Sequence, residues 1–455
     1  MIHTFKSTLL CYKDKRLLFI FLFGIASGFP WVMIGSALSA WLQESGLSRS
    51  SIGLFGSMFI AYSLNFLWSP LLDRVKPLFL GQRRGWILTT QILIVMGCIG
   101  LAVVPVKEQL LIAGLVGFSI ALFSATQDIS IDAYRIDIIK ADEKDKLSAA
   151  SAMATAGWWT GFGGLGSIPF FIADLPNWQW SEIYFVLAGI MALLSLVVLV
   201  SEEPVTDREY RQQLAAKAYS EWQTAKGELL NTRQKVVNWL LVTMLEPFRD
   251  FFQRNTFKLA FSILMFIFLF KMGEAFLGRM SIVFYKELGF SNSDIGSYSK
   301  LMTWWITIMF SILGGMVNIR YGIYRGLMVS GIAMAASNLM FALMAQVGPD
   351  KALYAATIFV DGFTAAWSSV ALVAFISLLC NQAFSASQYA LMASLGVLGR
   401  TFMASSSGFL VDWMDGNWSA FFILTAVMVI PSLVFLWTLR EHIARLERGE
   451  RLGEG

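Results

Sequence analysis

The sequence GLSRSSIG at residues 46–53 recurs as GFSNSDIG at residues 289–296. The two copies share the frame G-[LF]-S-x-S-x-I-G and are 243 residues apart, about half of the 455-residue chain. Each copy lies between two long apolar stretches, and the stretch that follows it ends in a basic loop, at 73–85 or at 318–326. A chain that repeats such a unit in the same order consists of two similar halves in parallel orientation.

The composition places these halves in a membrane. Hydrophobic residues make up 56% of the chain and charged residues only 15%, whereas a soluble domain carries about 25% charged residues. The apolar residues occur in runs of roughly 20, long enough to cross a hydrocarbon core of ~30 Å as helices. The alternating pattern of a membrane β-barrel is missing from the sequence.

We therefore predict an all-α integral membrane protein with twelve transmembrane helices in two pseudo-symmetric six-helix bundles. This arrangement resembles the major facilitator transporters. The expected domains are a bundle at 1–201, a cytosolic linker with surface helices at 202–257, a second bundle at 258–440 and a cytosolic tail at 441–455. The predicted spans are 17–40, 51–72, 86–105, 109–134, 147–172, 182–201, 258–285, 295–316, 323–346, 352–380, 387–411 and 418–439.

The orientation follows from the basic residues, because cytosolic loops of membrane proteins are rich in lysine and arginine. With the N-terminus inside, the short cytosolic segments hold seventeen such residues, the linker not included. The external segments hold four: Arg49, Lys107, Lys286 and Lys351. We expect both termini to be cytosolic, in a multi-pass protein whose basic start shows no cleavable signal peptide.

The sequence gives little support for an enzymatic activity. It contains no phosphate loop, no G-x-S-x-G elbow and no metal-binding box. The three cysteines are far apart, and the two histidines, His3 and His442, lie near the termini. We expect no enzyme, no cofactor, no metal and no nucleic-acid partner. Any proton chemistry inside the membrane must then use carboxylates.

Function is best sought at ionisable residues inside the predicted spans. Such a group costs roughly 2.5–3.5 kcal/mol on insertion scales, so it normally faces protein or a water-filled cavity. Eight candidates lie inside the spans and Arg135 lies one residue beyond the fourth; the nine are Asp128, Asp132, Arg135, Lys271, Glu274, Arg279, Lys300, Asp361 and Arg400.

Asp128 and Asp132 are four residues apart, so they share one face of the fourth span, with Arg135 near the next turn. Our interpretation is a proton-binding carboxylate tuned by a nearby cation. The alternative is structural, with Asp132 and Arg135 pairing near the cytosolic end with loop residues. Gln127 is a candidate partner for sugar hydroxyls.

Lys271 and Arg400 each lie about 20 Å into their helices from the cytosolic end, near the depth where transporter sites are found. Arg400 suits an anionic substrate, because guanidinium binds carboxylates in a bidentate manner. Lys271 and Glu274 are candidates for substrate or proton binding, or they neutralise each other. Arg400 has the analogous alternative of pairing with Asp361 or Glu274. The candidate substrate-binding set is Gln127, Lys271, Arg400, Lys300, Asp361 and Gln388, and the candidate proton-coupling set is Asp128, Glu274 and Asp132.

The two basic loops are candidate gates. Charged contacts between spans that form in one conformation and break in another give a two-state element. The alternative is that these arginines only keep the loops on the cytosolic side. The candidate gating residues are Asp73, Arg74, Arg83, Arg84, Arg320 and Arg325.

Several strings resemble one family. They are ASGFP at 26–30, FLWSPLLDR at 66–74, RRGW at 83–86, SATQDI at 124–129, PFRDFF at 247–252, KMGEAF at 271–276, and LCN with FSASQ at 379–388. They are similar to the AmpG muropeptide permeases over about residues 17–440. Some members carry further hydrophobic C-terminal helices, and the linker of this chain is longer than expected.

The resemblance implies proton-driven import of N-acetylglucosaminyl-1,6-anhydro-N-acetylmuramic acid, with or without peptide, across the bacterial inner membrane. It places Gln127 and Asp128 on the family's Gln-Asp pair, and Glu274 where some members have aspartate. Lys271, Lys300 and Arg400 match basic positions of the family. Transport of another anion, such as acetyl-CoA or a peptide, and a membrane sensor that does not transport are the alternatives.

Overall fold

The computed structural model describes residues 11–47, 55–77, 80–139, 143, 146–173, 175–204, 245–290, 294–295, 298, 302–404 and 406–448. Their regular elements are helices, and no β-strand occurs among them. The prediction of an all-α fold is confirmed. Most of the repeated motif, Lys300 and the linker from 205 to 244 lie outside the described residues.

The first span of the N-terminal half is interrupted twice. It consists of α2 (Lys15–Gly28), α3 (Pro30–Ile34) and α4 (Ser36–Glu44), and α3 begins at a proline, whose missing N–H is tolerated in a first helical turn. The other elements of this half are η1 (Gly56–Phe59), α6 (Ile60–Leu64), η2 (Asn65–Leu67), α7 (Ser69–Arg74), α8 (Arg83–Val103), α9 (Leu110–Asp137), α10 (Lys146–Trp159), η3 (Thr160–Gly164), η4 (Leu165–Ser167), α11 (Ile168–Ala173) and α12 (Trp180–Val200).

The C-terminal half repeats this plan. Its first span is interrupted at Lys271, between α15 (Phe257–Phe270) and α16 (Met272–Leu288). The elements that follow are α18 (Thr303–Tyr321), α19 (Ile323–Val347), α20 (Lys351–Leu379), η6 (Gln382–Phe384), α21 (Ser385–Ala404), α22 (Ser407–Trp413), α23 (Trp418–Val427), α24 (Ile430–Thr438) and α25 (Arg440–Glu447). In the linker, residues 245–254 are helical, as predicted for that part.

Eight helices of the described residues are long and apolar enough to cross a membrane. They correspond to the first, third, fourth and sixth predicted spans of each half. The remaining predicted spans, the second and fifth of each half, contain α6–α7, α10–α11, α18 and α21–α22. These less apolar segments make the contacts between the halves: α10 packs against α18, and α21 packs against α7 and α9. They therefore face protein instead of lipid along part of their length.

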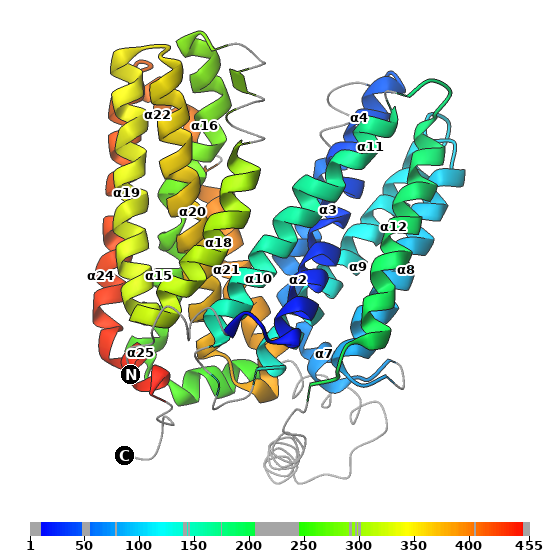
Figure 1. Ribbon diagram of the computed structural model, residues 1–455, viewed down its shortest axis with the longest axis horizontal. Coiled ribbons are helices and arrows are strands. Elements are labelled where there is room, and N and C mark those ends of the chain that lie inside the picture. The colour runs from blue at the N-terminus through cyan, green and yellow to red at the C-terminus, as the bar shows by residue number, and fades with distance from the viewer. Residues whose placement is uncertain are drawn as a thin grey trace, which may run out of the picture.

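Figure 1 shows two helical bundles, one from each half. The bundles approach each other at the end where α7 and α25 lie, and they diverge toward the end where α4 and α16 lie. The lysine and arginine distribution predicts that the end with α7 is cytosolic. We call it the predicted cytosolic end.

The two halves make matching contacts at the end of the molecule opposite to the predicted cytosolic end. Trp180 Nε1 donates to Glu44 Oε2 at 2.6 Å and ties the sixth span to the first. Trp418 Nε1 donates to Glu287 Oε2 at 2.7 Å and does the same in the second half. The two glutamates are separated by the same 243 residues as the copies of the sequence motif. In each half the sequence motif therefore follows a glutamate that ties the first span to the sixth. We call each of these Trp–Glu contacts a clasp.

At the predicted cytosolic end, an ion cluster joins the starts of α2 and α10. Glu143 accepts from Arg16 Nη1 and from Lys146 Nζ, both at 2.7 Å. Hydrogen bonds from Arg16, followed by those from Lys146, lower the pKa of Glu143 to about 2. A lowered folded-state pKa contributes stability above the ordinary carboxyl pKa, and that stability is lost only as pH falls toward 2. We expect this cluster to be insensitive to pH between 5 and 8.

Candidate functional site

Asp128 lies mid-helix in α9, at the boundary with α2 and α3. Ser27 Oγ donates to Asp128 Oδ1 at 2.7 Å. Trp31 and Tyr62 are close enough to Asp128 to interact with it electrostatically. Asp132 lies one turn further along the same helix face and contacts Tyr389 of the other half. Asp128 is partly exposed, and helical periodicity places it near the face of α9 on which Asp132 contacts the C-terminal half.

Lys271 occupies the break between α15 and α16, and its ammonium group already has three partners. Its ammonium pairs with Glu274 and donates to Ser368 Oγ at 2.8 Å and to Ala365 O at 3.2 Å on α20. The Lys271 residue is only 3% exposed, whereas the Glu274 side chain is 30% exposed. In this conformation Lys271 and Glu274 therefore neutralise each other, which is one of the two alternatives that the sequence left open for them. Lys271 holds the broken helix to α20 and leaves Glu274 as the accessible partner.

Arg400 is exposed, and its one described hydrogen bond joins Nε to Gly396 O of its own helix at 3.3 Å. No ion pair of Arg400 occurs among the described residues, so the alternative of pairing with Asp361 or Glu274 is absent from this conformation. Arg400 lies eleven residues after Tyr389, which is about three helical turns. It therefore shares the face of α21 that contacts the N-terminal half at Tyr389.

Asp361 lies on α20 in the same region. Ser337 Oγ of α19 donates to Asp361 Oδ1 at 3.1 Å. Asp361, Glu274 and Arg400 all lie within electrostatic range of Lys271. The structure thus brings together four of the predicted residues of the C-terminal half, with two cations and two carboxylates.

Two predicted substrate residues lie elsewhere. Gln127 is fully buried, and its Nε2 donates to Ala26 O at 2.7 Å, so it packs α9 against α2. Gln388 Nε2 donates to Asp250 Oδ2 at 2.7 Å and to Pro247 O at 3.1 Å in the linker helix. Gln388 is twelve residues before Arg400 on α21, a separation of about 18 Å. In this conformation Gln388 is a contact of the linker, and it is not close to the Arg400 region.

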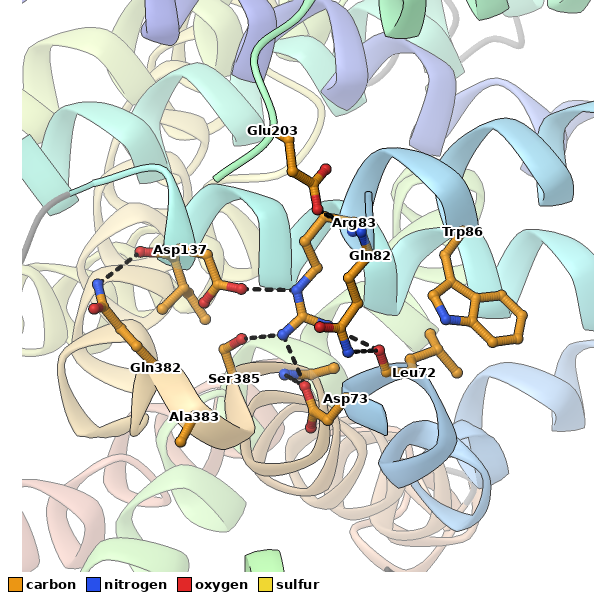
Figure 2. A network of polar contacts seen from close by, with 12 residues as sticks. Leu72, Asp73, Gln82, Arg83, Trp86, Asp137, Glu203, Gln382, Ala383 and Ser385 are labelled. Carbon is orange, nitrogen blue, oxygen red and sulfur yellow. Dashed lines mark hydrogen bonds and ion pairs between the residues drawn. The ribbon is translucent and has the colours of Figure 1, made fainter. Parts of the chain in front are cut away.

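The first basic loop forms a buried contact between the halves (Figure 2). Arg83 donates from Nη2 to Asp73 Oδ1 at 2.8 Å and from Nε to Asp137 Oδ2 at 2.7 Å. The same Nη2 donates to Ser385 Oγ of the other half at 2.8 Å. Asp73 also accepts from the backbone N–H of Ser387 at 2.9 Å. We call these five residues the gate, after the role that the sequence predicts for Asp73 and Arg83.

The Asp73 carboxylate of the gate lies at the N-terminus of α21. The unpaired N–H groups and the dipole of a helix N-terminus attract an anion, and Asp73 supplies its carboxylate there. Arg83 is fully buried between two carboxylates, so removal of one partner leaves an uncompensated buried charge. Both ion pairs lie within the N-terminal half, so the bonds that join the halves here are those to Ser385, Ala386 and Ser387.

A second tie between the halves lies beside the gate. Arg135 donates to Asp132 Oδ1 at 2.9 Å and to Ser377 Oγ of α20 at 2.9 Å. Its guanidinium also lies over the ring of Tyr389, 5.0 Å from the centroid. None of the hydrogen bonds between the halves in the described residues lies at the opposite end, where α4 and α16 end. The described hydrogen bonds between the halves thus extend from the predicted cytosolic end to Ser394, whose Oγ donates to Asn65 Oδ1 at 2.8 Å, and Gly163 packs against Trp304 further along.

The other predicted gating residues do not take part in the gate. Arg74 Nη2 pairs with Glu246 of the linker helix at 2.6 Å. Arg84 donates to Val198 O at 2.9 Å and to Leu199 O at 3.1 Å within its own half. Arg320 lies over Tyr321, and Arg325 is exposed. Among the described residues, the first basic loop therefore contacts the other half through Arg83 and Asp73, and the second shows no equivalent ion pair.

Sequence reasoning missed Asp137, Ser385 and Ser387. Asp137 lies just beyond the predicted end of the fourth span, and the only signal for it was its short distance in sequence from Arg135. The serines belong to the FSASQ string at 384–388, but their contacts with residues about 300 positions away have no local signature.

Replacing Gly315 by valine is expected to open the predicted cytosolic end. A Cβ atom at Gly315 would lie 2.5 Å from Tyr12 Oη and 2.7 Å from Ala152 Cβ, where α18 packs on α10. A larger side chain must push the halves apart there. We expect a cysteine placed at Ser387 to react faster with a cytosolic thiol reagent in the variant. Gly189→Val is the matched control, because no atom lies within 4 Å of a Cβ at Gly189; equal rates in both variants would contradict the expectation.

Comparison with known proteins gives consistent results. A family model described as the Major Facilitator Superfamily matches residues 20–299. A "Putative transporter AmpG 4" of Rickettsia felis is 31% identical over 95% of this chain and 98% of its own length. The "Anhydromuropeptide permease" of Escherichia coli K12 is 30% identical over 95% of this chain and 81% of its own length.

Solved structures show the same fold at low sequence identity. The proton:xylose symporter XylE superposes with a TM-score of 0.64 at 15% identity, covering 93% of this chain and 94% of its own. The transporter FucP in the outward conformation gives a TM-score of 0.66 at 13% identity, covering 94% of this chain and 99% of its own.

Proposed function

The chain belongs to the major facilitator superfamily and is related to the AmpG anhydromuropeptide permease, and from this premise we propose its substrate, coupling ion and direction. The proposed substrate is an anhydro-muropeptide, N-acetylglucosaminyl-1,6-anhydro-N-acetylmuramic acid with or without peptide. The proposed process is import with protons from periplasm to cytoplasm, across the bacterial inner membrane, with both termini cytosolic.

The observation that carries this proposal is that Arg400 is an exposed residue within a predicted span. An arginine at this depth is costly unless water or an anion compensates its charge, and no ion pair of Arg400 occurs among the described residues. A muropeptide supplies the missing anion through its lactyl or peptide carboxylate. Lys271 is buried and paired, so Arg400 is the better candidate for the first contact with substrate.

Two features support proton coupling. The described histidine, His442, lies in α25 near the end of the chain, so carboxylates remain for proton transfer within the spans. Asp128 is partly exposed on the face toward the C-terminal half and has a hydroxyl partner in Ser27. A carboxylate whose surroundings alternate between water and apolar protein changes its proton affinity. We assign the proton to Asp128 and keep Glu274 and Asp132 as secondary candidates.

The gate supports alternating access. Asp73, Arg83 and Asp137 hold the N-terminus of α21 in a conformation that is closed at the predicted cytosolic end. Delivery of substrate to the cytosol requires these contacts to break. Hydrogen bonds from charged side chains to the other half, which form in one conformation and break in another, suit such a two-state transition.

Counterflow in proteoliposomes tests the proposed function. Vesicles preloaded with unlabelled disaccharide should take up labelled N-acetylglucosaminyl-1,6-anhydro-N-acetylmuramic acid at well above the rate of protein-free vesicles. A panel with acetyl-CoA and free stem peptide serves as the comparison. Uptake of only another anion would replace the substrate class, and binding without counterflow would indicate a sensor that does not transport.

A further inference from the structure

Six aromatic side chains of the N-terminal half form one continuous cluster. Trp31 lies 4.5 Å from Tyr62 and 5.7 Å from Trp158, measured between ring centroids. Trp158 stacks on Phe162 at 5.1 Å and meets Trp159 edge to face at 5.5 Å. We call these residues, with Phe59, the aromatic cluster; its members are Trp31, Phe59, Tyr62, Trp158, Trp159 and Phe162.

Two members of this cluster carry polar groups beside a carboxylate. Trp31 and Tyr62 both lie near the Asp128 carboxylate. Trp31 Nε1 and Tyr62 Oη are buried, and neither makes a hydrogen bond of normal geometry with the described residues. Buried donors normally have partners. Ring faces beside a carboxylate and two unsatisfied donors match what a carbohydrate offers, which is apolar C–H faces edged by hydroxyl and amide groups.

Three members of the cluster, Trp158, Trp159 and Phe162, lie where the fifth span is irregular. There α10 continues into η3, a π-helical turn over Thr160–Gly164, and π-bulges are frequently found at functional sites. Gly161 packs against Ile25 O of α2, and Gly163 packs against the ring of Trp304 from the other half. The irregular turn, which lies next to the cluster, is therefore at the boundary between the halves.

The position of Trp159 on its helix supports the same conclusion. Ser148 and Ala152 of α10 approach Gly315 of α18, and Gly163 approaches Trp304 of the same helix. Trp159 lies seven residues after Ala152 and four before Gly163, so helical periodicity places it on this face. Its side chain is partly exposed, as required of a ring that receives a ligand between the halves.

Other tryptophans of the described residues have different surroundings. Trp305 is 64% exposed on α18, and Trp367 is buried and donates to Asn318 Oδ1 at 2.9 Å. Trp180 and Trp418 donate to the glutamates of the two outer clasps. Trp158 and Trp159 are partly exposed within a cluster that reaches Asp128.

We propose that the aromatic cluster is the carbohydrate subsite of the transporter, a proposal that rests on the proposed function above. The sugar rings stack on Trp158 and Trp159, and their hydroxyl and amide groups meet Asp128. The anionic end of the substrate then points across the boundary to Arg400. The N-terminal half recognises the sugars and the C-terminal half the charge, so the substrate bridges both halves before they move.

The test compares two ligands that differ by one sugar ring. Dissociation constants are measured for N-acetylglucosaminyl-1,6-anhydro-N-acetylmuramic acid and for 1,6-anhydro-N-acetylmuramic acid, using wild type, Trp158→Leu and Trp159→Leu in nanodiscs. Each variant should bind the disaccharide about tenfold more weakly. At least one should lose the preference for disaccharide over monosaccharide. Trp305→Leu is the matched control and should stay within twofold of wild type.

Conservative variants and cross-linking separate stacking from folding. Trp158→Phe and Trp159→Phe keep a ring and should remain within about threefold of wild type. A disaccharide with a photoreactive N-acyl group, bound to the wild-type protein, should cross-link to residues 155–164. Cross-links confined to the C-terminal half, or wild-type sugar preference in both leucine variants, would overturn the subsite. Wild-type protein that binds neither ligand would instead overturn the proposed function.

Discussion

Replacing Asp128 by asparagine is expected to abolish accumulation of substrate against its gradient while leaving exchange close to the wild-type rate. Asparagine keeps the shape and the hydrogen bond to Ser27, but it cannot bind and release a proton. A carrier without its proton site no longer couples to the proton gradient, whereas exchange of bound substrate needs no net proton movement. Accumulation in energised vesicles should therefore fall to the level reached without a gradient.

The control for this prediction is Asp412→Asn, an exposed carboxylate in α22 away from the site. It should accumulate substrate normally. Normal accumulation by Asp128→Asn would remove Asp128 from the proton role and transfer the test to Glu274→Gln. Loss of both accumulation and exchange would mean that Asp128 is needed for the movement or for binding, and not specifically for coupling.

Replacing Arg400 by glutamine should weaken binding of a carboxylate substrate by about thirtyfold or more, since the loss of a charged partner costs 2 kcal/mol or more. The free guanidinium has no ion pair to break among the described residues, so its removal should not destabilise the fold. A carboxamide analogue of the disaccharide lacks the anion and should lose less than threefold. Dissociation constants for both ligands give the comparison.

Two further variants sharpen the interpretation of Arg400. Arg400→Lys keeps the charge but not the bidentate geometry, so it should recover only part of the affinity. Arg325→Gln removes an exposed arginine from the second basic loop and should leave both ligands unaffected. Equal losses for the acid and the carboxamide in Arg400→Gln would show that Arg400 is structural.

The sequence was sufficient to predict the architecture. Apolar runs of roughly 20 residues indicate helices that cross the bilayer, and the motif repeated at residues 46 and 289 indicates two halves. Pro30 is a residue type that bends a span, but the breaks at Gly35 and Lys271 were not predicted. Their positions depend on how α2 packs against α10 and how Lys271 reaches α20, which are contacts between segments distant in sequence.

The site could be predicted only as separate residues. Charges inside apolar helices are visible in the sequence because lipid disfavours them, and this criterion found Asp128, Lys271, Glu274, Asp361 and Arg400. It could not show that Lys271 is already paired while Arg400 has no ion pair among the described residues, because that depends on which helix faces each side chain. The gate shows the same limit, since Asp73 and Arg83 were predicted but their partners on α21 were not.

The account rests on a water-filled path between the halves that is open to the periplasm and shut by the gate. Thiol labelling of Gly396→Cys tests this most directly, because Gly396 lies one turn from Arg400 and a Cβ there meets only ordinary contacts at 3.5 Å and beyond. In a chain without native cysteines, a membrane-impermeant maleimide added outside right-side-out vesicles should label this cysteine, and disaccharide should protect it. A cysteine at Val434, an exposed apolar position of α24, should resist the same reagent. Absence of labelling at Gly396→Cys from the outside, or labelling only from the cytosolic side, would contradict the account.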